Sequence, residues 1–487
     1  MKFTEYKALE LTKIAQEILQ FWKDNNIFQK SIDFRNGKEP FIFYEGPPSA
    51  NGLPGIHHVM ARALKDIFCR FHTQLGAQVF RKAGWDTHGL PVELGVEKEL
   101  GITKDDIGKK ISMADYNKAC KEAVMRYTDI WNDLTQKIGY WVDMEDPYIT
   151  YKPKYMESVW WLLKQLYNKG LLYKGYTIQP YSPKAGTGLS SHELNQPGCY
   201  RDVSDTTVVA QFKVRQFPEK LAKHFESIKE PIHILAWTTT PWTLPSNTAL
   251  AVGKEIEYVL VKTYNQYTFE PITIIIGKPL LAKQFGKKFV EGDAEAFAAY
   301  TPESKTIPYQ ILGECKGADL VGTTYEQLIA WCAPAENADQ AFRVIAGDFV
   351  TTDDGTGIVH IAPTFGADDA RVAKEYGVPP MLVKDAHGNL IPLVDLQGKF
   401  IEGHNIPEAF AGKYIKNEYY DAGQAPEKSW DVSLAILLKE ENKAFKVEKY
   451  VHSYPHCWRT DKPVLYYPLD SWFVRVTDFK ERMFDLN

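Results

Sequence analysis

The sequence predicts an α/β protein in which a β-rich domain interrupts an open parallel sheet. Residues 41–44 form a short apolar run, typical of a strand buried on both faces. Residues 45–55 are rich in proline and glycine, and an amphipathic helical pattern begins near His57. After about Gly198 the helical patterns give way to short β-branched runs. The first pattern predicts a βα unit of a parallel sheet, and the second predicts a separate β domain.

Length and composition limit the class of protein. A chain of 487 residues is expected to form two or three domains, at about 150 residues each. The net charge of -5 argues against a uniformly basic nucleic-acid coat, although a local basic face stays open. The six cysteines form no Cys-x-x-Cys pair, and neither a signal-peptide core nor an apolar run of about 18 residues is present. We therefore expect a cytoplasmic protein without a membrane segment.

Helical patterns surround the predicted strand of the first domain. Apolar residues recur at helical spacing within residues 10–28, 112–131 and 155–168, and the aromatic residues of the last pattern are expected to belong to the core. Residues 41–66 resemble a phosphate-binding turn, because a helix that begins beyond the carboxyl end of a strand attracts anions. An ordinary βα unit with an apolar loop is the alternative. Asp86 and His88 interrupt a later apolar segment, which predicts functional groups at the end of a second strand.

The second half of the chain carries the β-rich pattern. Two unusual stretches, WTTTPWTLPSN (237–247) and DDGTGIVHIAPTFGADD (353–369), lie far apart within it. Residues 449–487 again resemble the aromatic first domain, include the expected strand SWFVRV, and end without a cap or tail, which we interpret as the end of a fragment. We expect domains at 1–198, 199–440 and 441–487. Strands are predicted at 208–214, 232–240, 258–263 and 272–276.

Five motifs in series resemble those of class I isoleucyl-tRNA synthetases over essentially the whole chain. They are GPPSANGLPGIHH, GWDTHGLPVE, WTTTPWTLPSN, GTGIVHIAPTFGADD and HSYPHCWRTDKPVLYYPLDSWFV. The second motif also differs from its counterparts in the valyl and leucyl enzymes. The resemblance implies a Rossmann-type catalytic domain split by an editing domain. It further implies ATP-dependent attachment of isoleucine to tRNA(Ile), with Mg²⁺, by a monomer that also hydrolyses misactivated valine and valyl-tRNA(Ile).

By this resemblance, the first motif contains the family's HIGH signature, which binds ATP. Here the signature reads GIHH at residues 55–58. His58 matches the second histidine, Gly55 stands in place of the first, and His57 stands in place of the glycine. One hypothesis is that the positions are exchanged, so that His57 supplies the missing donor while Gly55 relaxes the backbone. The alternative is that the imidazole of His57 obstructs the adenine.

The resemblance also implies an amino-acid site. Asp86 would hold the α-ammonium group of isoleucine through a charge-assisted contact. Without the resemblance, Asp86 is interpreted as a turn or N-cap aspartate before Gly89. His88 is expected to pack and to form hydrogen bonds in the pocket wall. The isoleucine pocket would be lined by Gly46, Pro47 and Ser49.

An editing site answers a physical need. One methylene in an apolar pocket is worth only about 1–3 kcal/mol, an effect for which the isoleucyl enzyme itself is the standard example. By resemblance, Asp369 would hold the α-ammonium of misattached valine, and His360 would contact the substrate or the tRNA terminus. A hydroxyl ladder in a strand and a satisfied core histidine are the alternatives. Asp368 is expected to face solvent. The polar wall would consist of Thr238, Thr239, Thr240 and Thr243.

Two further expectations concern a zinc site and the activities that this chain can carry out. Many bacterial relatives hold zinc with two Cys-x-x-Cys pairs, whereas residues 181–185 and 456–460 here supply a single Cys457, so we predict no zinc and a buried thiol. The second lysine-rich signature of the class, KMSKS, does not occur in the sequence. We therefore expect the chain to lack tRNA charging but to retain editing. The alternative is a non-catalytic tRNA-binding module.

Overall fold

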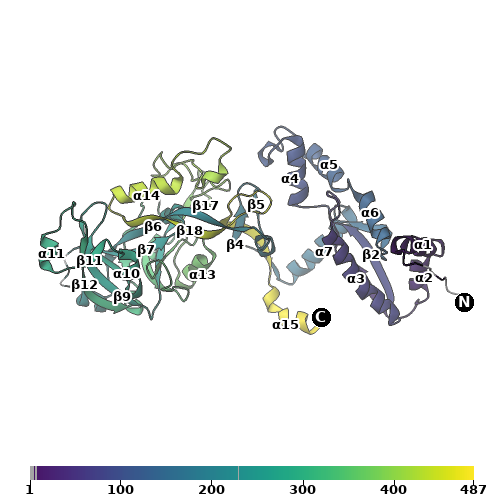
Figure 1. Cartoon of the computed structure of the whole chain (residues 1–487), viewed down its shortest axis with the longest axis horizontal. Helices are drawn as coiled ribbons and strands as arrows, with labels where there is room; N and C mark the ends of the chain where they lie inside the picture. The colour runs from purple at the N-terminus through teal and green to yellow at the C-terminus, as the bar shows by residue number, and fades with distance from the viewer. Residues whose placement is uncertain (1–4, 6–7, 227, 229, 487) are drawn as a thin grey trace. The chain divides into compact units, whose positions relative to one another are not determined.

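The computed structural model describes residues 5, 8–226, 228 and 230–486. It contains two compact units, both drawn in Figure 1. The first comprises Met1–Tyr173 with Val474–Asn487, and the second is Lys174–Phe473. None of the described helices combines the length and the hydrophobicity that crossing a membrane requires.

The first unit is built on a parallel sheet. Its strands are β1 (Pro40–Tyr44), β2 (Gln78–Trp85) and β3 (Asp143–Ile149), in the order β1-β2-β3. Helix α3 (Ile56–Gln74) connects the first two strands, so the predicted βα unit is confirmed. The other helices of this unit are α1 (Leu11–Asp24), α2 (Ile27–Asp33), α4 (Leu90–Leu100), α5 (Met113–Val124), α6 (Thr128–Lys137), α7 (Pro153–Asn168) and α15 (Lys480–Leu486).

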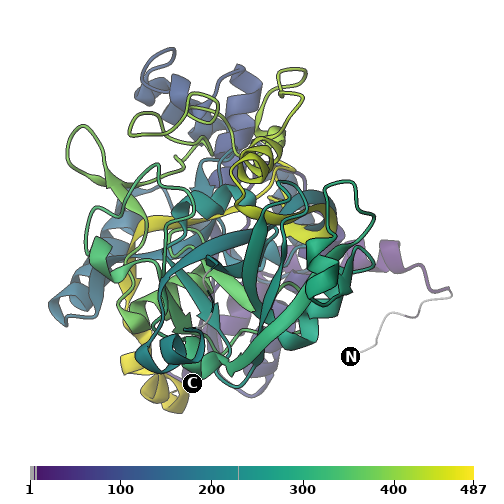
Figure 2. The same ribbon diagram turned by 90° about the vertical axis from the view of Figure 1, so that its left-hand side faces the viewer.

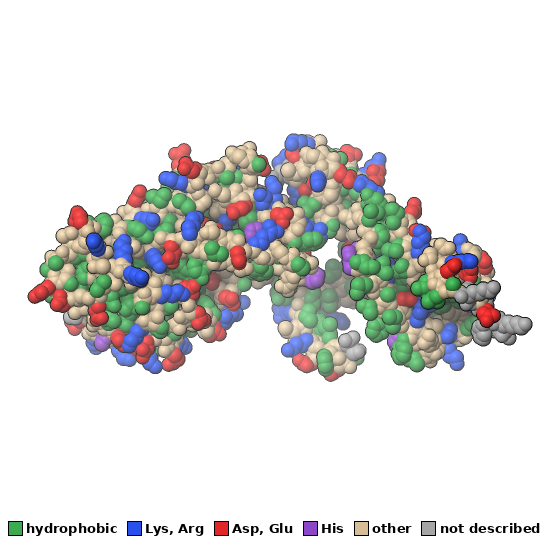
Figure 3. Space-filling model, in the orientation of Figure 1, with side chains coloured by type: hydrophobic (Ala, Val, Ile, Leu, Met, Phe, Trp, Pro, Cys, Tyr) green, Lys and Arg blue, Asp and Glu red, His purple; other side chains and the backbone are tan. Residues whose placement is uncertain are grey.

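Two expectations about the core of this unit are wrong. Strand β1, an edge strand next to β2, is not buried on both faces, because its alternate side chains are exposed, with Ile42 at 65%. Trp160 and Trp161 on α7 are 63% and 61% exposed, since this helix contributes no buried side chain among the described residues. Helix α3 also carries exposed apolar residues, and Figure 3 shows hydrophobic side chains gathered over this unit.

The second unit is β-rich, as predicted. Three of the four predicted runs lie within strands, namely β6 (Tyr200–Gln216), β9 (Glu257–Tyr264) and β10 (Pro271–Gly277). The fourth, predicted at 232–240, is β7 (Ile232–Thr238), which ends two residues earlier than predicted. Additional strands of the same sheet are β8 (Ala249–Val252), β11 (Phe289–Glu291), β12 (Ile307–Lys316), β13 (Thr324–Tyr325), β14 (Arg343–Ala346), β15 (Ile358–Ile361) and β18 (Ala444–Pro455). The strand order β7-β15-β8-β14-β13-β6 returns to β7 through a β7–β6 pairing, so these six strands close into a ring. Figure 2, which faces this unit, shows the curled sheet.

Strand β7 is the central strand of this unit. Ile234 packs into one hydrophobic core, and its neighbour Leu235 packs into a second core on the opposite side. Because successive side chains of a strand point to opposite faces, a strand between two cores is mostly apolar. Strand β7 ends at Thr238, and the WTTTPWTLPSN stretch continues into the buried helix η2 (Pro241–Ser246), whose Trp242 and Leu244 belong to the first core.

The compact second unit extends beyond the expected insertion at 199–440. Strands β4 (Leu172–Ser182), β5 (Thr187–Gly188) and β19 (Leu465–Val474) form a separate sheet. Strand β19 includes the first four residues of the predicted SWFVRV strand and ends two residues before it does. Strand β18 pairs with β6 along most of its length. The boundaries at 198 and 440 stay a prediction for the editing domain. In the structure, the strands on either side of these boundaries belong to the same compact unit as the β-rich sheet.

Candidate active sites

Polar loops follow all three parallel strands of the first unit and meet at one edge of the sheet. After β1 and β2, the Ser49 hydroxyl donates to the carbonyl of Asp86 (2.9 Å), and the Asp86 amide donates to the carbonyl of Pro48 (3.0 Å). After β3, the Thr150 hydroxyl accepts the amide of Thr87 (3.0 Å) and lies 3.0 Å from Nδ1 of His88. Ligands of open α/β sheets bind at this carboxyl edge.

Asp86 is not the N-cap of the following helix. Helix α4 is capped by Gly89, whereas the Asp86 carboxylate accepts a long contact of 3.5 Å from the amide of His88. The N-cap interpretation is therefore wrong, while the contact with the amide two residues on agrees with the turn interpretation. The carboxylate is partly exposed and can also meet a ligand. Thr150, which the sequence analysis missed, joins the same cluster; the preceding segment DMEDPYI is not an apolar run, so no sequence pattern marks Thr150.

The GIHH segment forms the first turn of α3. Gly55 is the N-cap, and its amide donates to Nδ1 of His58 (2.9 Å). Nδ1 of His58 is therefore unprotonated, and Nε2 carries the hydrogen as an outward donor. Burial lowers the pKa of His58, and the nearby His57 and Arg62 lower it further. The exposed His57 ring lies 3.8 Å from the His58 ring, centroid to centroid.

The His57 ring fills the space next to Gly55. A Cβ added at Gly55 would lie 2.9 Å from Cε1 and 3.0 Å from Nδ1 of His57. A side chain at position 55 and the present ring of His57 therefore cannot occupy the same place. A side chain at position 55 would therefore require the exposed His57 ring to move, and the exchange of positions stays a hypothesis.

Buried groups support this helix start. Trp131 donates from Nε1 to the carbonyl of Gly52 (2.9 Å) and packs edge-on against His58 at 4.7 Å. The Arg62 guanidinium lies 4.8 Å from the same indole ring. Glu45, buried directly after β1, accepts hydrogen bonds from Lys65 and Tyr140. These contacts fix the loop and the His58 ring before any ligand arrives.

The threonines of the second unit form a turn rather than a strand ladder. Strand β7 ends at Thr238, and the short helix η2 (Pro241–Ser246) begins two residues after Thr239. The hydroxyl of Thr238 accepts the amide of Thr240 (3.0 Å) and lies 3.3 Å from its hydroxyl. The Thr243 hydroxyl donates to the carbonyl of Thr240 (2.8 Å). The structure thus brings three of the four predicted threonines into one hydrogen-bonded chain, with the partly buried Thr239 between them.

His360 completes this chain from β15. Its Nε2 lies 2.9 Å from the Thr243 hydroxyl, whose own hydrogen is already given to Thr240, so Nε2 is the donor. Its Nδ1 lies 3.3 Å from the side-chain amide of Asn247, which can donate to it. Burial lowers the pKa of His360 to about 4, in agreement with a neutral ring. Both ring nitrogens therefore have protein partners, as in a satisfied core histidine.

Asp369 lies in the first turn of α13 (Ala367–Tyr376), close to the end of β15. Its Oδ2 accepts the amide of Ala362 (2.8 Å), the residue directly after β15. Burial, the largest cause, raises the pKa of Asp369 to about 6. Asp368 is exposed, as expected. The geometry therefore separates the two neighbouring acids: one carboxylate is fixed at the end of the strand, and the other faces solvent.

The cysteines hold no metal centre in the part of the chain that the structure describes. No group of three or more potential ligands among His, Cys, Asp and Glu gathers there, and all six cysteines are free thiols. Cys457 is fully buried, as predicted. The absence of zinc stays a prediction.

The fold and the sites define an α/β sheet with polar loops at its carboxyl edge, joined to a closed β-rich unit with its own polar site. The model of the family described as tRNA synthetases class I (I, L, M and V) matches residues 17–487. The chain belongs to this family.

Named relatives agree with this assignment. The isoleucine–tRNA ligase of Bacteroides fragilis is 59% identical over 499 residues, covering 100% of this chain and 43% of the relative. The isoleucine–tRNA ligase of Porphyromonas gingivalis is 58% identical, covering 99% and 43%. The chain thus spans less than half the length of these relatives. A solved ternary complex of Agrobacterium radiobacter K84 agnB2 LeuRS, tRNA and LeuAMS covers 91% of this chain at 16% identity, with a TM-score of 0.29, a likeness too weak to carry an argument.

Proposed function

We propose that the chain is the activation and editing portion of an isoleucine–tRNA ligase, which joins isoleucine to tRNA(Ile) with ATP and hydrolyses misattached valine. The 59% identity to a ligase of that name supports the substrate. The observation that carries the editing activity is the hydrogen-bonded chain from Thr238 to His360 on β15, together with the Asp369 carboxylate that is fixed at the end of the same strand.

The first unit would bind ATP and isoleucine. The start of the 19-residue helix α3 carries a partial positive charge that favours phosphates, and the Nε2–H of His58 adds a donor there. Mg²⁺ would be held mainly by the phosphates, as is usual for this ion. Asp86 would bind the α-ammonium of isoleucine, beside a pocket lined by Gly46, Pro47 and Ser49. Hydrogen bonds already tie Ser49 to the Asp86 loop.

The second unit would hydrolyse valyl-tRNA(Ile). At neutral pH a carboxylate whose pKa is about 6 is mostly ionised and attracts an ammonium group, which would favour ionisation further. The threonine hydroxyls would orient the water or the ester, and their methyl groups would restrict the size of the amino acid. His360 would hold Thr243 in place, since contact with a substrate through a ring nitrogen would require breaking one of its present bonds.

The test is deacylation of valyl-tRNA(Ile) by the 487-residue chain. We expect hydrolysis above the spontaneous rate, and a loss of about 10- to 100-fold in Asp369→Ala, because charge-assisted hydrogen bonds contribute about 1.5–3 kcal/mol. Asp368→Ala, which removes the exposed neighbouring acid, is the matched control and should keep the wild-type rate. Normal deacylation by Asp369→Ala would refute the assigned role.

A tRNA-binding module without catalysis is the competing function. Such a module would bind valyl-tRNA(Ile) in a filter assay but would leave the ester intact. Binding without hydrolysis by the wild-type chain would therefore select this alternative. We also propose a monomer in the cytoplasm; its support is that all six cysteines are free thiols, in keeping with a reducing compartment.

A further inference from the structure

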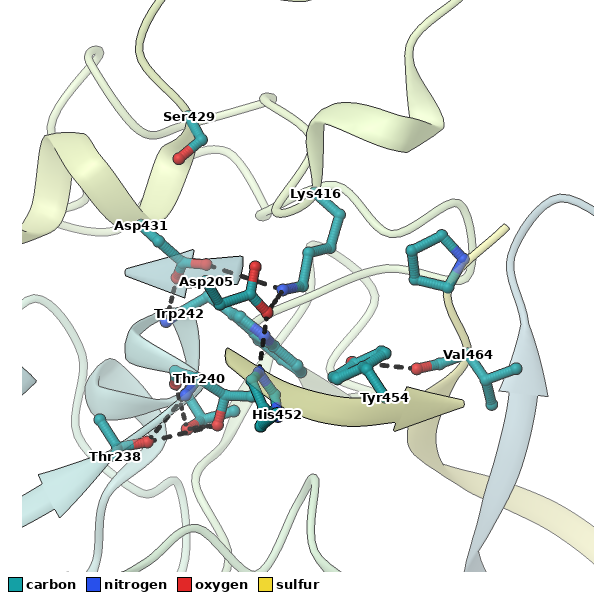
Figure 4. A network of polar contacts seen from close by, with 12 residues as sticks. Asp205, Thr238, Thr240, Trp242, Lys416, Ser429, Asp431, His452, Tyr454 and Val464 are labelled. Carbon is teal, nitrogen blue, oxygen red and sulfur yellow. Dashed lines mark hydrogen bonds and ion pairs between the residues drawn. The ribbon is translucent and has the colours of Figure 1, made fainter. Parts of the chain in front are cut away.

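A buried cluster of charged residues lies next to the threonine turn of the second unit, and the proposed chemistry does not use it. Lys416 Nζ lies 2.8 Å from Oδ2 of Asp205 on β6 and 3.9 Å from Oδ2 of Asp431 on α14 (Trp430–Glu440). His452 Nε2 on β18 lies 3.2 Å from the same oxygen of Asp205. Figure 4 shows dashed lines from the Lys416 nitrogen to both aspartates. The cluster therefore joins three secondary-structure elements and the loop that carries Lys416.

One atom of the cluster leads directly to the candidate editing site. Oδ1 of Asp431 accepts the backbone amide of Trp242 at 2.8 Å, and both residues are buried. Trp242 lies in η2, between Thr240 and Thr243, whose own hydrogen bond spans it. The position of this amide therefore constrains both threonines.

The Trp242 side chain extends the same constraint to the other half of the site. Its ring packs edge-on against Phe365 at 5.0 Å, centroid to centroid. Phe365 lies in the loop between Ala362 and Asp369, which the Asp369 carboxylate closes through the Ala362 amide. Trp242 thus contacts both the threonine turn and the loop of the fixed carboxylate.

Stability alone does not account for such a cluster. Buried ion pairs contribute little net stability, because the cost of removing charges from water offsets their attraction. Lys416 is 6% exposed and Asp431 is 5% exposed, and burial raises the pKa of Asp431 to about 7, which reflects the cost of holding its charge there. What a hydrogen-bonded buried carboxylate does supply is a fixed geometry.

We propose that Asp431, held by Lys416 and Asp205, is a positioning residue for editing: it fixes Trp242, and through Trp242 it aligns the threonine turn with the Asp369 loop. This inference rests on the proposed editing function. It assigns Asp431 no contact with the substrate. The required property is an acceptor oxygen at the Trp242 amide, which asparagine also offers and alanine does not.

Two measurements on the full 487-residue chain test the proposal. The first is single-turnover hydrolysis of valyl-tRNA(Ile), analysed for its maximal rate and its half-saturating protein concentration. Asp431→Ala should lower the rate by about 10- to 100-fold, the effect of misplacing a group by about 1 Å, while half-saturation stays unchanged. Asp431→Asn should stay within about twofold of wild type. The control is Asp385→Ala, which removes a partly exposed aspartate that accepts the amides of His387 and Asn389 in the turn between β16 (Leu382–Lys384) and β17 (Leu390–Pro392).

The second measurement is backbone hydrogen exchange in peptides 237–247 and 361–369, and it does not depend on catalysis. Exchange should accelerate in both peptides in Asp431→Ala and should stay at the wild-type rate in Asp431→Asn. Wild-type hydrogen exchange in the alanine variant, or equal losses of protection in both variants, would overturn the proposal.

If the wild-type chain does not deacylate valyl-tRNA(Ile), the editing function fails, while hydrogen exchange still decides the structural role of Asp431. If Asp431→Ala does not fold, Asp431→Val takes its place; failure of both, with a folded asparagine variant, would indicate a general folding role and overturn the proposal.

Discussion

At the scale of single residues, the second unit holds two ionisable groups whose pKa values are displaced in opposite directions. Burial raises the pKa of Asp369 to about 6 and lowers that of His360 to about 4. Near neutral pH the first is therefore mostly an anion and the second is neutral. An anion beside neutral donors and acceptors suits the recognition of an ammonium group without an internal ion pair.

This arrangement predicts that Asp369 lowers the free energy of unfolding by an amount that depends on pH. Because its folded pKa exceeds its ordinary value of 3.8, the folded chain binds more protons than the unfolded chain between about pH 4 and 6. Stability from the protonated form is present below pH 4 and is lost as pH rises through 6. The shift corresponds to an upper value of about 3 kcal/mol, which solvent screening reduces at this partly exposed side chain.

Asp369→Asn should therefore gain stability relative to wild type as pH rises from 4.5 to 7, and the difference should become constant above pH 7. Urea unfolding across this range measures it. His360 acts in the opposite sense, because its lowered pKa costs stability as pH falls from 6.5 towards 4, but this effect is common to both proteins and cancels in the difference. Glu427→Gln, at an exposed position, is the control. A difference that does not change with pH would contradict the assignment.

At the scale of elements, the first turn of α3 combines two departures from the family signature. The His57 ring lies where a side chain at position 55 would begin, so a histidine at position 55 would displace the His57 ring from its present place. We expect Gly55→His alone to lower isoleucine-dependent ATP–pyrophosphate exchange at least about tenfold in a protein extended to the length of its relatives. The double variant Gly55→His with His57→Gly, which restores the family order, should recover most of the activity.

Gly95→Ala on α4 is the control variant in the pyrophosphate-exchange assay, since its added Cβ would lie in open space. Full activity of Gly55→His alone, or no recovery in the double variant, would contradict the exchange of positions. If the unchanged protein showed no ATP–pyrophosphate exchange, that result would instead favour obstruction of the adenine by His57.

The elements also show what could be read from the sequence. The strands β6, β7, β9 and β10 follow from local β-branched runs, and the threonines, His360 and Asp369 follow from motifs. The closure of the six-strand ring cannot be predicted from the sequence, because β13 has only two residues and closure depends on pairings between distant segments. Asp431 and Lys416 have no motif, so only the fold reveals that they meet near Trp242.

At the scale of the whole molecule, the chain enters and leaves the β-rich unit through neighbouring strands. Strands β4 and β19 are adjacent in their sheet, and the unit boundaries at Lys174 and Phe473 fall within them. The unit contains its own buried cores, with Phe212, Ile234 and Tyr325 almost fully inaccessible to solvent. A segment with a closed core and adjacent ends has the properties of a domain that folds alone.

We therefore expect residues 174–473 to fold by themselves, with one cooperative urea transition, and to retain deacylation of valyl-tRNA(Ile). The shorter segment 199–440, which follows the sequence boundaries, is the matched comparison. It lacks β18, so β6 loses its partner from Tyr200 to Ala210, Phe445 leaves the core, and the Asp205 cluster loses His452. An unpaired β6 edge and an incomplete core should make this segment aggregate or unfold without cooperativity. Equal stability of the two segments would show that the flanking strands are not part of the folding unit.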